Sequence, residues 1–523
     1  MSENSNDTGK MGLNRIAIVC NSPVNQSKIG NPNPPVYKAF ATAKACGFNV
    51  VMYPGSDVEP DEWIEYMDKA LIHCKKLGIK LISNSPILNY AGKNRTDWPT
   101  AFVQHYIPTE VPIENLSPEE QEFQDALIAL VGWQVKDEPL YYDWTKDYPY
   151  YYKKIENGKS SIILPDEVTP DDLELLGKET EPKLLKFDCG KILDNYDTIK
   201  KIDPDRLLFC NLAVDYKSKW IGNNRTYAQY LDEYISTFKP TVLSFDYYPI
   251  DDINVDGTTT HYLHDSTFYN NLIMFAEKSQ QYNIPFWAYC LCLEHSTGEG
   301  GRDYPYPTEG MMRFEAFSAL AFGAQGIVYW QYRLDDLNSG TSSSQSSQSR
   351  PTLNGGAQLG NVSSIGSSTD DKGVPVYGNG VTTSVWQSIQ KINSDIIKEN
   401  DKFFNCKLIS YNLCFGNTDC HLHGEAGIDI IKSSGKGFLM THIETPDPEK
   451  KDGNGNPVIN KYIVIVSRDP FKSQELQWLY VQDPNSTVDK NICTPVFNNT
   501  GNYENDPWRK EILPPGGYHI FKC

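Results

Sequence analysis

The chain has 523 residues, more than one barrel domain of ordinary size requires, so a large domain and a smaller one are expected. Its composition, with 39% hydrophobic and 22% charged residues, is typical of a soluble globular protein. The formal net charge of −19 argues against nucleic acid or an anionic membrane surface as a partner. No run of about 18 apolar residues is present, so no membrane span is expected.

Strand-like and helix-like segments alternate along the first 400 residues. The predicted strands are Ile16–Cys20, Phe48–Tyr53, Ile79–Ser83, the run ending at Gly132–Pro139, Leu207–Cys210, Val242–Phe245, Pro285–Cys292 and Gly326–Trp330. The predicted helices are Val36–Cys46, Asp61–Leu77, one that begins at the capping box Ser117–Glu120, Leu193–Ile202, Tyr227–Phe238, Phe268–Tyr282, Thr308–Phe322 and Val385–Lys398. Because the strands are apolar on both faces, the pattern predicts an α/β fold, a closed parallel (β/α)8 TIM barrel over residues 15–402.

Three features stand outside this pattern. Residues 1–14 are polar and are expected to form a disordered leader. A long tyrosine-rich loop is expected between Leu140 and Asp188, and its many rings argue against disorder. The segment Asn338–Gly373 is rich in Ser and Gly and predicts a mobile flap, so deleting Ser342–Ser347 should change the thermal midpoint little.

From residue 403 to residue 523 the pattern changes to short strands separated by turns. Period-two runs at Gly437–Met440, Tyr462–Val466, Leu476–Val481 and Pro515–Phe521 predict a small C-terminal antiparallel β-sandwich. Support of the barrel by packing is the favoured role for this domain, and sugar binding is the alternative. The twelve cysteines lack metal-ligand spacing and are interpreted as structural thiols.

Polar and aromatic residues gather where the predicted strands end, which is the face of a barrel that carries its chemistry. The most informative is Glu138, which follows Asp137 and precedes Pro139, and we expect Pro139 to hold Glu138 in extended geometry. The other strand-end residues are Asn21, Asn84, Asn211, Asp246 and Trp330. Burial against Trp133 and the charge of Asp137 should both raise the pKa of Glu138.

At this point the chain resembles the retaining glycoside hydrolases of clan A, which carry their acid/base Glu in an Asn-Glu-Pro sequence at the end of strand four. Asp137-Glu138-Pro139 occupies that place, and the segment Ala321–Arg333 looks loosely like the corresponding part of the family 42 β-galactosidases. Two departures stand out. Asp137 replaces the clan's Asn, and the seventh strand contains no acid before Glu294.

The resemblance implies an O-glycosyl hydrolase that cleaves an oligo- or polysaccharide with two carboxylates. Glu138 is the expected acid/base, and Glu294 is the first candidate for the nucleophile, followed by Asp246, Glu299 and Glu309. The expected substrate-binding residues are Asp137, Asn21, Asn84, Asn211, Tyr247, Trp287 and Trp330. The alternative function is a non-catalytic carbohydrate-binding barrel, in which the missing strand-seven Glu reflects lost activity.

The sequence supports no cofactor and no metal. It contains no Gly-rich phosphate loop, no HExxH zinc motif and no Gly-x-Ser-x-Gly elbow. The polar opening also lacks an apolar signal core, so the protein is either cytoplasmic or exported after removal of a signal. Of these, an extracytoplasmic location is favoured.

Overall fold

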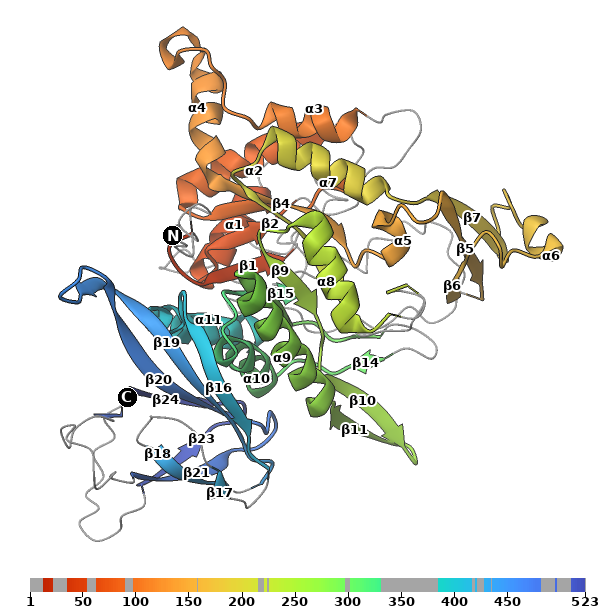
Figure 1. The fold of residues 1–523 in the computed structure, drawn as a ribbon. Helices are drawn as coiled ribbons and strands as arrows, with labels where there is room; N and C mark the ends of the chain where they lie inside the picture. The colour runs from red at the N-terminus through yellow and green to blue at the C-terminus, as the bar shows by residue number, and fades with distance from the viewer. Residues whose placement is uncertain are drawn as a thin grey trace. The chain divides into compact units, whose positions relative to one another are not determined.

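The computed structural model describes residues 13–21, 35–53, 63–89, 97–157, 159–214, 221–222, 225–296, 302–330, 384–415, 419–420, 428–433, 435–480, 494–495 and 509–522. Figure 1 shows the course of the chain from the N-terminus to the C-terminus. The chain divides into two compact units. The first comprises Met1–Met52, Lys76–Ile79 and Tyr247–Cys523, and the second comprises Tyr53–Lys75 and Lys80–Asp246.

Eight parallel strands close into a barrel in the order β1-β15-β12-β9-β8-β4-β3-β2. They are β1 (Ala17–Asn21), β2 (Val50–Met52), β3 (Lys80–Ser83), β4 (Leu130–Asp137), β8 (Leu207–Ala213), β9 (Leu243–Asp246), β12 (Phe286–Leu291) and β15 (Gly326–Trp330). Most strand positions are buried on both faces, as in other closed parallel sheets. The predicted (β/α)8 barrel is confirmed.

Helices alternate with the barrel strands, and their bounds lie close to the predicted ones. They are α1 (Pro35–Ala45), α2 (Trp63–Leu77), α3 (Trp98–His105), α4 (Pro118–Ala126), α7 (Lys191–Ile202), α8 (Tyr227–Phe238), α9 (Asp265–Tyr282), α10 (Glu309–Ala321), α11 (Ser384–Lys398) and the short α12 (Asn400–Phe403). The capping box that begins α4 is confirmed. The Ser117 backbone N–H donates to Glu120 Oε2 at 2.7 Å, and Glu120 N–H donates to Ser117 Oγ at 3.3 Å.

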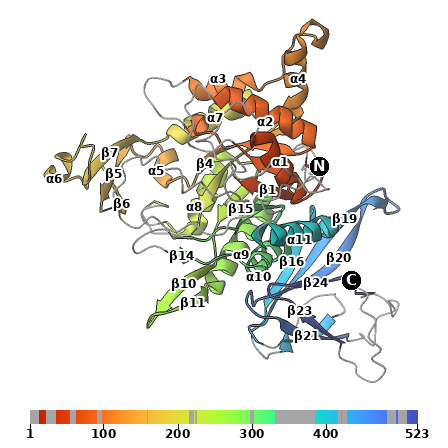
Figure 2. The ribbon, with the colours of Figure 1, turned by 180° about the vertical axis from the view of Figure 1, so that it is seen from behind.

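The expected long loop after β4 is instead a small folded insertion in the second unit. It contains α5 (Tyr141–Trp144), β5 (Tyr150–Glu156), β6 (Lys159–Ile163), α6 (Pro170–Leu173) and β7 (Lys183–Asp188). Its strands form an antiparallel sheet in the order β6-β5-β7, which lies beyond α5 in both views (Figures 1 and 2). The expectation of a loop was wrong because its aromatic residues pair across strands, as Tyr151 does with Phe187 at 5.4 Å between ring centroids.

The C-terminal part of the first unit is a two-sheet antiparallel sandwich, as predicted. One sheet has the order β16-β19-β20-β24-β22, with bounds Lys407–Leu413, Phe438–Lys451, Pro457–Ser467, Tyr518–Lys522 and Thr494–Pro495. The other has the order β17-β18-β21-β23, with bounds Asp419–Cys420, Ile428–Ser433, Gln474–Tyr480 and Arg509–Leu513. Side chains of both sheets, such as Phe438 and Leu476, share one buried core.

Contacts inside the first unit join the sandwich to barrel helices. The ring of Phe317 on α10 stacks on Tyr518 with centroids 3.9 Å apart, and Arg468 forms an ion pair of 2.7 Å with Asp265 on α9. These contacts are those expected of a domain that supports the barrel by packing.

Strands from two loops of the first unit form a further sheet with the order β11-β10-β14-β13. The loop after β9 contributes β10 (Ile250–Val255) and β11 (Thr258–Leu263), and the loop after β12 contributes β13 (His295–Ser296) and β14 (Asp303–Tyr304). Both loops follow the carboxyl ends of barrel strands. Loops at these positions in the sequence form the active sites of barrel enzymes.

Some expectations concern residues outside the described part of the chain, namely most of the leader, the Ser- and Gly-rich segment 338–373 and Glu299. Cysteines such as Cys74 and Cys290 are free thiols and buried, as expected of structural thiols, whereas Cys414 is disulfide-bonded. Among the described helices, none is long and apolar enough to cross a membrane.

Candidate active site

Strand β4 ends in an irregular backbone that presents two adjacent carboxylates. The register between β4 and β8 shifts between Gln134 and Lys136, which marks a bulge. Two residues after Lys136, Glu138 has a φ of 44°, in the left-handed region that non-glycine residues rarely adopt. Side chains of a regular strand alternate between its faces, so the left-handed backbone at Glu138 breaks this alternation directly after Asp137, whose charge acts on the Glu138 carboxyl.

The expected extended geometry of Glu138 is therefore wrong. Pro139 disfavours a right-handed helical backbone at Glu138, but hydrogen bonds on both sides select a positive φ over the extended form. The Glu138 backbone N–H donates to the carbonyl of Asn211 at 2.8 Å. On the other side, the hydroxyl of Tyr230 donates to the carbonyl of Pro139 at 3.0 Å.

Asn211 connects three neighbouring strands at one level of the barrel. It pairs with Asp137 on β4 and with Ser244 on β9 in the strand register. Its side-chain amide donates to Asp137 Oδ1 at 2.9 Å, and its Oδ1 accepts from the Ser244 hydroxyl at 2.9 Å. Asn211, an expected substrate-binding residue, is 0% exposed, and its side-chain polar atoms are used to hold Asp137 and Ser244.

Asp137, Glu138 and Asp246, here called the acidic cluster, affect one another electrostatically. Burial raises the pKa of Glu138 to about 7, and the charge of Asp137 contributes. Burial also raises the pKa of Asp246 well above its ordinary value, and the charges of Glu138 and Asp137 raise it further. Among the described residues, no hydrogen-bond partner meets the buried Oδ1 of Asp246.

Asp137 differs from the other two members because it is exposed to solvent. The surrounding protein still desolvates its carboxylate and raises its pKa, whereas the hydrogen bond from Asn211 and the charge of Lys136 lower it. The acidic cluster thus combines one solvent-reachable carboxylate with two more enclosed ones, and it retains a proton near neutral pH.

Trp133 does not provide the burial of Glu138 that was expected of it. Its ring packs against Phe102 on α3 and against Tyr106, and its indole N–H donates to Asp203 at 2.8 Å. Trp133 therefore lies on the helix side of β4. The pKa of Glu138 is raised, as expected, but Trp133 is not the residue that buries it.

In the first unit, aromatic residues follow Asp246 in the sequence and lie at the carboxyl end of β15. Trp330 ends β15, and its ring stacks on Tyr248 with centroids 5.7 Å apart and planes 19° apart. Tyr247 follows β9 and lies below the guanidinium of Arg302, 5.5 Å from its ring centroid. Arg302 is held by an ion pair of 2.8 Å with Asp251.

Tyr248, Arg302 and Asp251 were not predicted from the sequence. Tyr248 could have been found from its place directly after Asp246 and Tyr247. Arg302 and Asp251 gave no comparable signal, because strand pairing between two distant loops brings them together.

Glu294, the first candidate for the nucleophile, follows β12 directly before β13 and is partly exposed. The end of β12 is held by Glu315 on α10, whose buried carboxylate accepts from the Leu291 N–H at 2.8 Å. Burial raises the pKa of Glu315 to about 8. Glu309, a lower-ranked candidate, instead binds Arg313 and Lys391 at 2.9 and 3.0 Å.

The remaining candidates fall into two groups. Asn21 and Asn84 lie at the ends of β1 and β3, and Asn84 Oδ1 is buried without a hydrogen-bond partner among the described residues. Trp287 lies at the opposite, amino end of β12, is 1% exposed and covers Gly326. This place is away from the carboxyl ends of the strands, where barrel enzymes bind their substrates, so the structure gives the expected substrate-binding role of Trp287 no support.

Within the described residues, no group of three His, Cys, Asp or Glu side chains could hold a metal ion. The chemistry that the acidic cluster itself can perform is proton donation and acceptance between carboxyl groups and a bound molecule.

Comparison with known proteins gives only distant structural similarity. No protein-family model matches the chain, and no curated protein matches it. A β-galactosidase from the psychrophilic Marinomonas ef1 has 10% identity and a TM-score of 0.40, over 97% of this chain and 100% of that one. An endo-β-1,4-mannanase from Thermotoga petrophila has 12% identity and a TM-score of 0.36, over 90% of this chain and 96% of that one. At these TM-scores the similarities carry no argument, and the barrel rests on its own strand pairing.

Proposed function

We propose that the protein is a glycoside hydrolase in which Glu138 donates the proton to the leaving group. The observation that carries this proposal is the pKa of Glu138, which burial and Asp137 raise to about 7 at the carboxyl end of a barrel strand. A carboxyl group with such a pKa is protonated in part at neutral pH, and this is the property that a general acid needs.

In the proposed reaction, Glu138 protonates the glycosidic oxygen while the bond between that oxygen and the anomeric carbon breaks. An ionised carboxylate attacks the anomeric carbon from the other face. Water then attacks the same carbon, the bond between that carbon and the second carboxylate breaks, and the water gives a proton to Glu138, so both carboxylates return to their starting states. The second carboxylate must therefore be deprotonated when Glu138 is protonated.

Glu294 remains our first candidate for this second carboxylate. Its support is the resemblance to clan A and its position after the seventh barrel strand. Asp246 is the alternative. Burial and the charges of Glu138 and Asp137 raise its pKa, which disfavours the ionised form that a nucleophile needs and suits a positioning group better.

A carbohydrate-binding barrel without catalysis is the second candidate function. The observation that favours it is the stacked pair Tyr248 and Trp330, since flat aromatic rings suit the apolar faces of sugars. An oligo- or polysaccharide is the proposed ligand in either case. The disulfide at Cys414 supports the proposed extracytoplasmic location, because disulfides persist in oxidising compartments.

The test compares Glu138→Gln with the wild-type protein on two classes of substrate. Turnover of glycosides with poor leaving groups should fall by about 100-fold or more, because only these need a proton donor. Turnover of activated aryl glycosides should change little. Glu120→Gln, an exposed Glu-to-Gln change at the α4 cap, is the matched control. Equal losses on both classes would remove Glu138 from the acid role, and binding without any turnover by the wild type would favour the second candidate.

A further inference from the structure

The backbone at Glu138 is held in an unfavourable conformation by its surroundings. A positive φ is unusual for any residue with a Cβ, and Pro139 further limits the choices of Glu138. Such a conformation persists only where neighbouring contacts determine it. The residues that supply those contacts therefore determine where the Glu138 carboxyl lies.

Hydrogen bonds bracket the turn on both sides. The N–H of Glu138 donates to Asn211 O at 2.8 Å. The N–H of Leu140 donates to Asp143 Oδ2 at 2.9 Å. Between them, the carbonyl of Pro139 accepts from the Tyr230 hydroxyl at 3.0 Å. Among these three hydrogen bonds, only the one from Tyr230 can be removed by deleting a single atom, its hydroxyl oxygen, without altering the backbone or the acidic cluster.

Tyr230 is well suited to this role. It is 2% exposed on α8, and its ring packs between Tyr227 and Trp144, with centroids 5.8 and 5.9 Å away. Burial raises the pKa of Tyr230, so the hydroxyl stays protonated and remains a donor. Glu138 is near enough for its charge to raise that pKa further.

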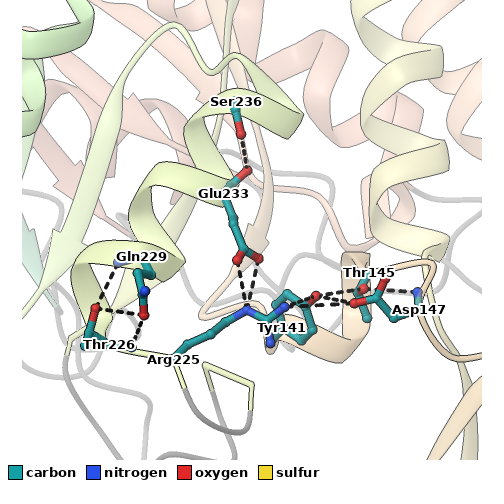
Figure 3. Close-up of polar contacts among 8 residues, drawn as sticks. All are labelled: Tyr141, Thr145, Asp147, Arg225, Thr226, Gln229, Glu233 and Ser236. Atoms are coloured by element: carbon teal, nitrogen blue, oxygen red, sulfur yellow. Dashed lines mark hydrogen bonds and ion pairs between the residues drawn. The ribbon is translucent and has the colours of Figure 1, made fainter.

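A second set of contacts holds α5, which follows Pro139, against α8. In Figure 3 the guanidinium of Arg225 lies over the ring of Tyr141, 3.9 Å from its centroid, and donates to its hydroxyl at 2.6 Å. Arg225 Nε also donates to both carboxylate oxygens of Glu233 on α8, at 3.1 and 3.0 Å. On the other side, the Tyr141 hydroxyl donates to Asp147 at 2.6 Å.

We propose that Tyr230 is a positioning residue for Glu138. The hydroxyl of Tyr230 holds the left-handed turn through its hydrogen bond to the Pro139 carbonyl, and Arg225 keeps α5 and α8 together. Without the hydroxyl, the turn relaxes and the Glu138 carboxyl leaves the desolvated place beside Asp137. The pKa of Glu138 then falls toward the ordinary value for Glu. The charged and titratable groups that face this region are Asp137 and Lys136 on β4, Cys210 on β8, Asp143 on α5 and Asp246 on β9.

The experiment measures the Glu138 carboxyl directly, so it does not depend on activity. Protein labelled with carboxyl-13C glutamate is titrated by NMR, and Glu138→Gln assigns the resonance. In Tyr230→Phe the midpoint should fall by about one pH unit, which is a tenfold smaller protonated-to-ionised ratio at neutral pH. Tyr196→Phe is the matched control, because its buried hydroxyl also donates to a strand carbonyl, Leu208 O at 2.7 Å, at the other end of β8.

Two results would overturn the proposal. One is an unchanged Glu138 midpoint in a folded Tyr230→Phe protein, and the other is an equal shift in Tyr196→Phe, which would show general loosening. If Tyr230→Phe does not fold, Arg225→Lys replaces it, and a smaller fall in the midpoint is expected. No fall in Arg225→Lys would then count against the proposal.

A kinetic arm rests on the proposed function. In Tyr230→Phe, the alkaline limb of kcat/KM should move to lower pH by the same amount as the NMR midpoint. A wild-type protein that hydrolyses no glycoside would refute the proposed function, while the titration would still decide the role of Tyr230.

Discussion

Asn211 donates its side-chain amide to Asp137 at 2.9 Å although the two residues come from different strands and are separated by 74 positions in the chain. The same amide side chain accepts from Ser244 on the next strand. A fully buried polar side chain thereby links β4, β8 and β9 beside Asp137 of the acidic cluster. Its cost of burial is offset only while both partners are present.

Replacing Asn211 with Ala should therefore destabilise the second unit. The substitution removes the hydrogen bond to the Asp137 carboxylate and the neutral one from the Ser244 hydroxyl. Together these losses should cost about 2–4 kcal/mol in the free energy of unfolding. Urea unfolding measures this cost. Ser244→Ala removes only the neutral bond and should cost about 1–2 kcal/mol. A smaller loss in Asn211→Ala than in Ser244→Ala would contradict the bridging role.

The raised pKa of Glu138 predicts a pH-dependent loss of stability. In the folded state the pKa of its carboxyl is about 7, whereas in the unfolded chain the pKa is near 4.5, the ordinary value for Glu. The folded state therefore binds more protons between these values, and stability falls as pH rises through this window. Glu138→Gln, which cannot ionise, should be more stable than the wild type above pH 7 by about 1–3 kcal/mol.

Below about pH 4 the two proteins should have nearly the same free energy of unfolding, because the wild-type carboxyl is then protonated in both states. Chemical unfolding at several pH values measures the difference. Glu120→Gln again serves as the control and should show no gain at high pH, since its carboxylate accepts hydrogen bonds that lower its pKa. If Glu138→Gln raised the free energy of unfolding equally at all pH values, the gain would not come from the ionisation of Glu138, and the prediction would be contradicted.

Gly326 should tolerate no side chain, because Trp287 occupies the place of a Cβ. An added Cβ would lie 2.6 Å from the Trp287 ring, which is fully buried and has little room to move. Gly326→Ala should destabilise the first unit by about 1–3 kcal/mol in thermal or urea unfolding. Gly453→Ala in the turn between β19 and β20 meets nothing within 4 Å and should be neutral. This result would support a structural role for Trp287 in place of the expected role in binding.

Periodic features were predictable from the sequence, and local exceptions to periodicity were not. Apolar strands and a capping box gave the barrel and the start of α4, because both depend on neighbouring residues. The turn at Glu138 was mispredicted, since Pro139 alone favours extended geometry and the opposing bonds come from Asn211 and Tyr230, far away in the chain.

Side-chain direction limited the site prediction in the same way. Asn211 and Trp287 were chosen for their place near strands, but the sequence alone did not reveal that Asn211 faces Asp137 or that Trp287 lies at the amino end. Ser244 could have been found, because it lies two residues before Asp246 and so on the same face of β9. The role of Tyr230 could not be predicted, since the sequence pattern of a buried tyrosine on a helix is the same whether or not its hydroxyl holds a turn beside a catalytic residue.

The identity of the second carboxylate is the sharpest remaining prediction. If Glu294 is the nucleophile, Glu294→Gly should form no covalent glycosyl-enzyme, and external azide should restore turnover by attacking from the vacated side. Asp246→Asn should instead lower kcat or raise KM without responding to azide, because a positioning group leaves no nucleophile to replace. Product analysis for the glycosyl azide, with inverted configuration at the anomeric carbon, is the measurement that separates the two roles. Rescue of Asp246→Gly, with none for Glu294→Gly, would reverse the assignment and would mean that the acidic cluster supplies both the acid and the nucleophile. If neither change reduces activity, the paired-carboxylate mechanism must be abandoned, since no single carboxyl can both protonate the leaving oxygen and attack the opposite face of the sugar.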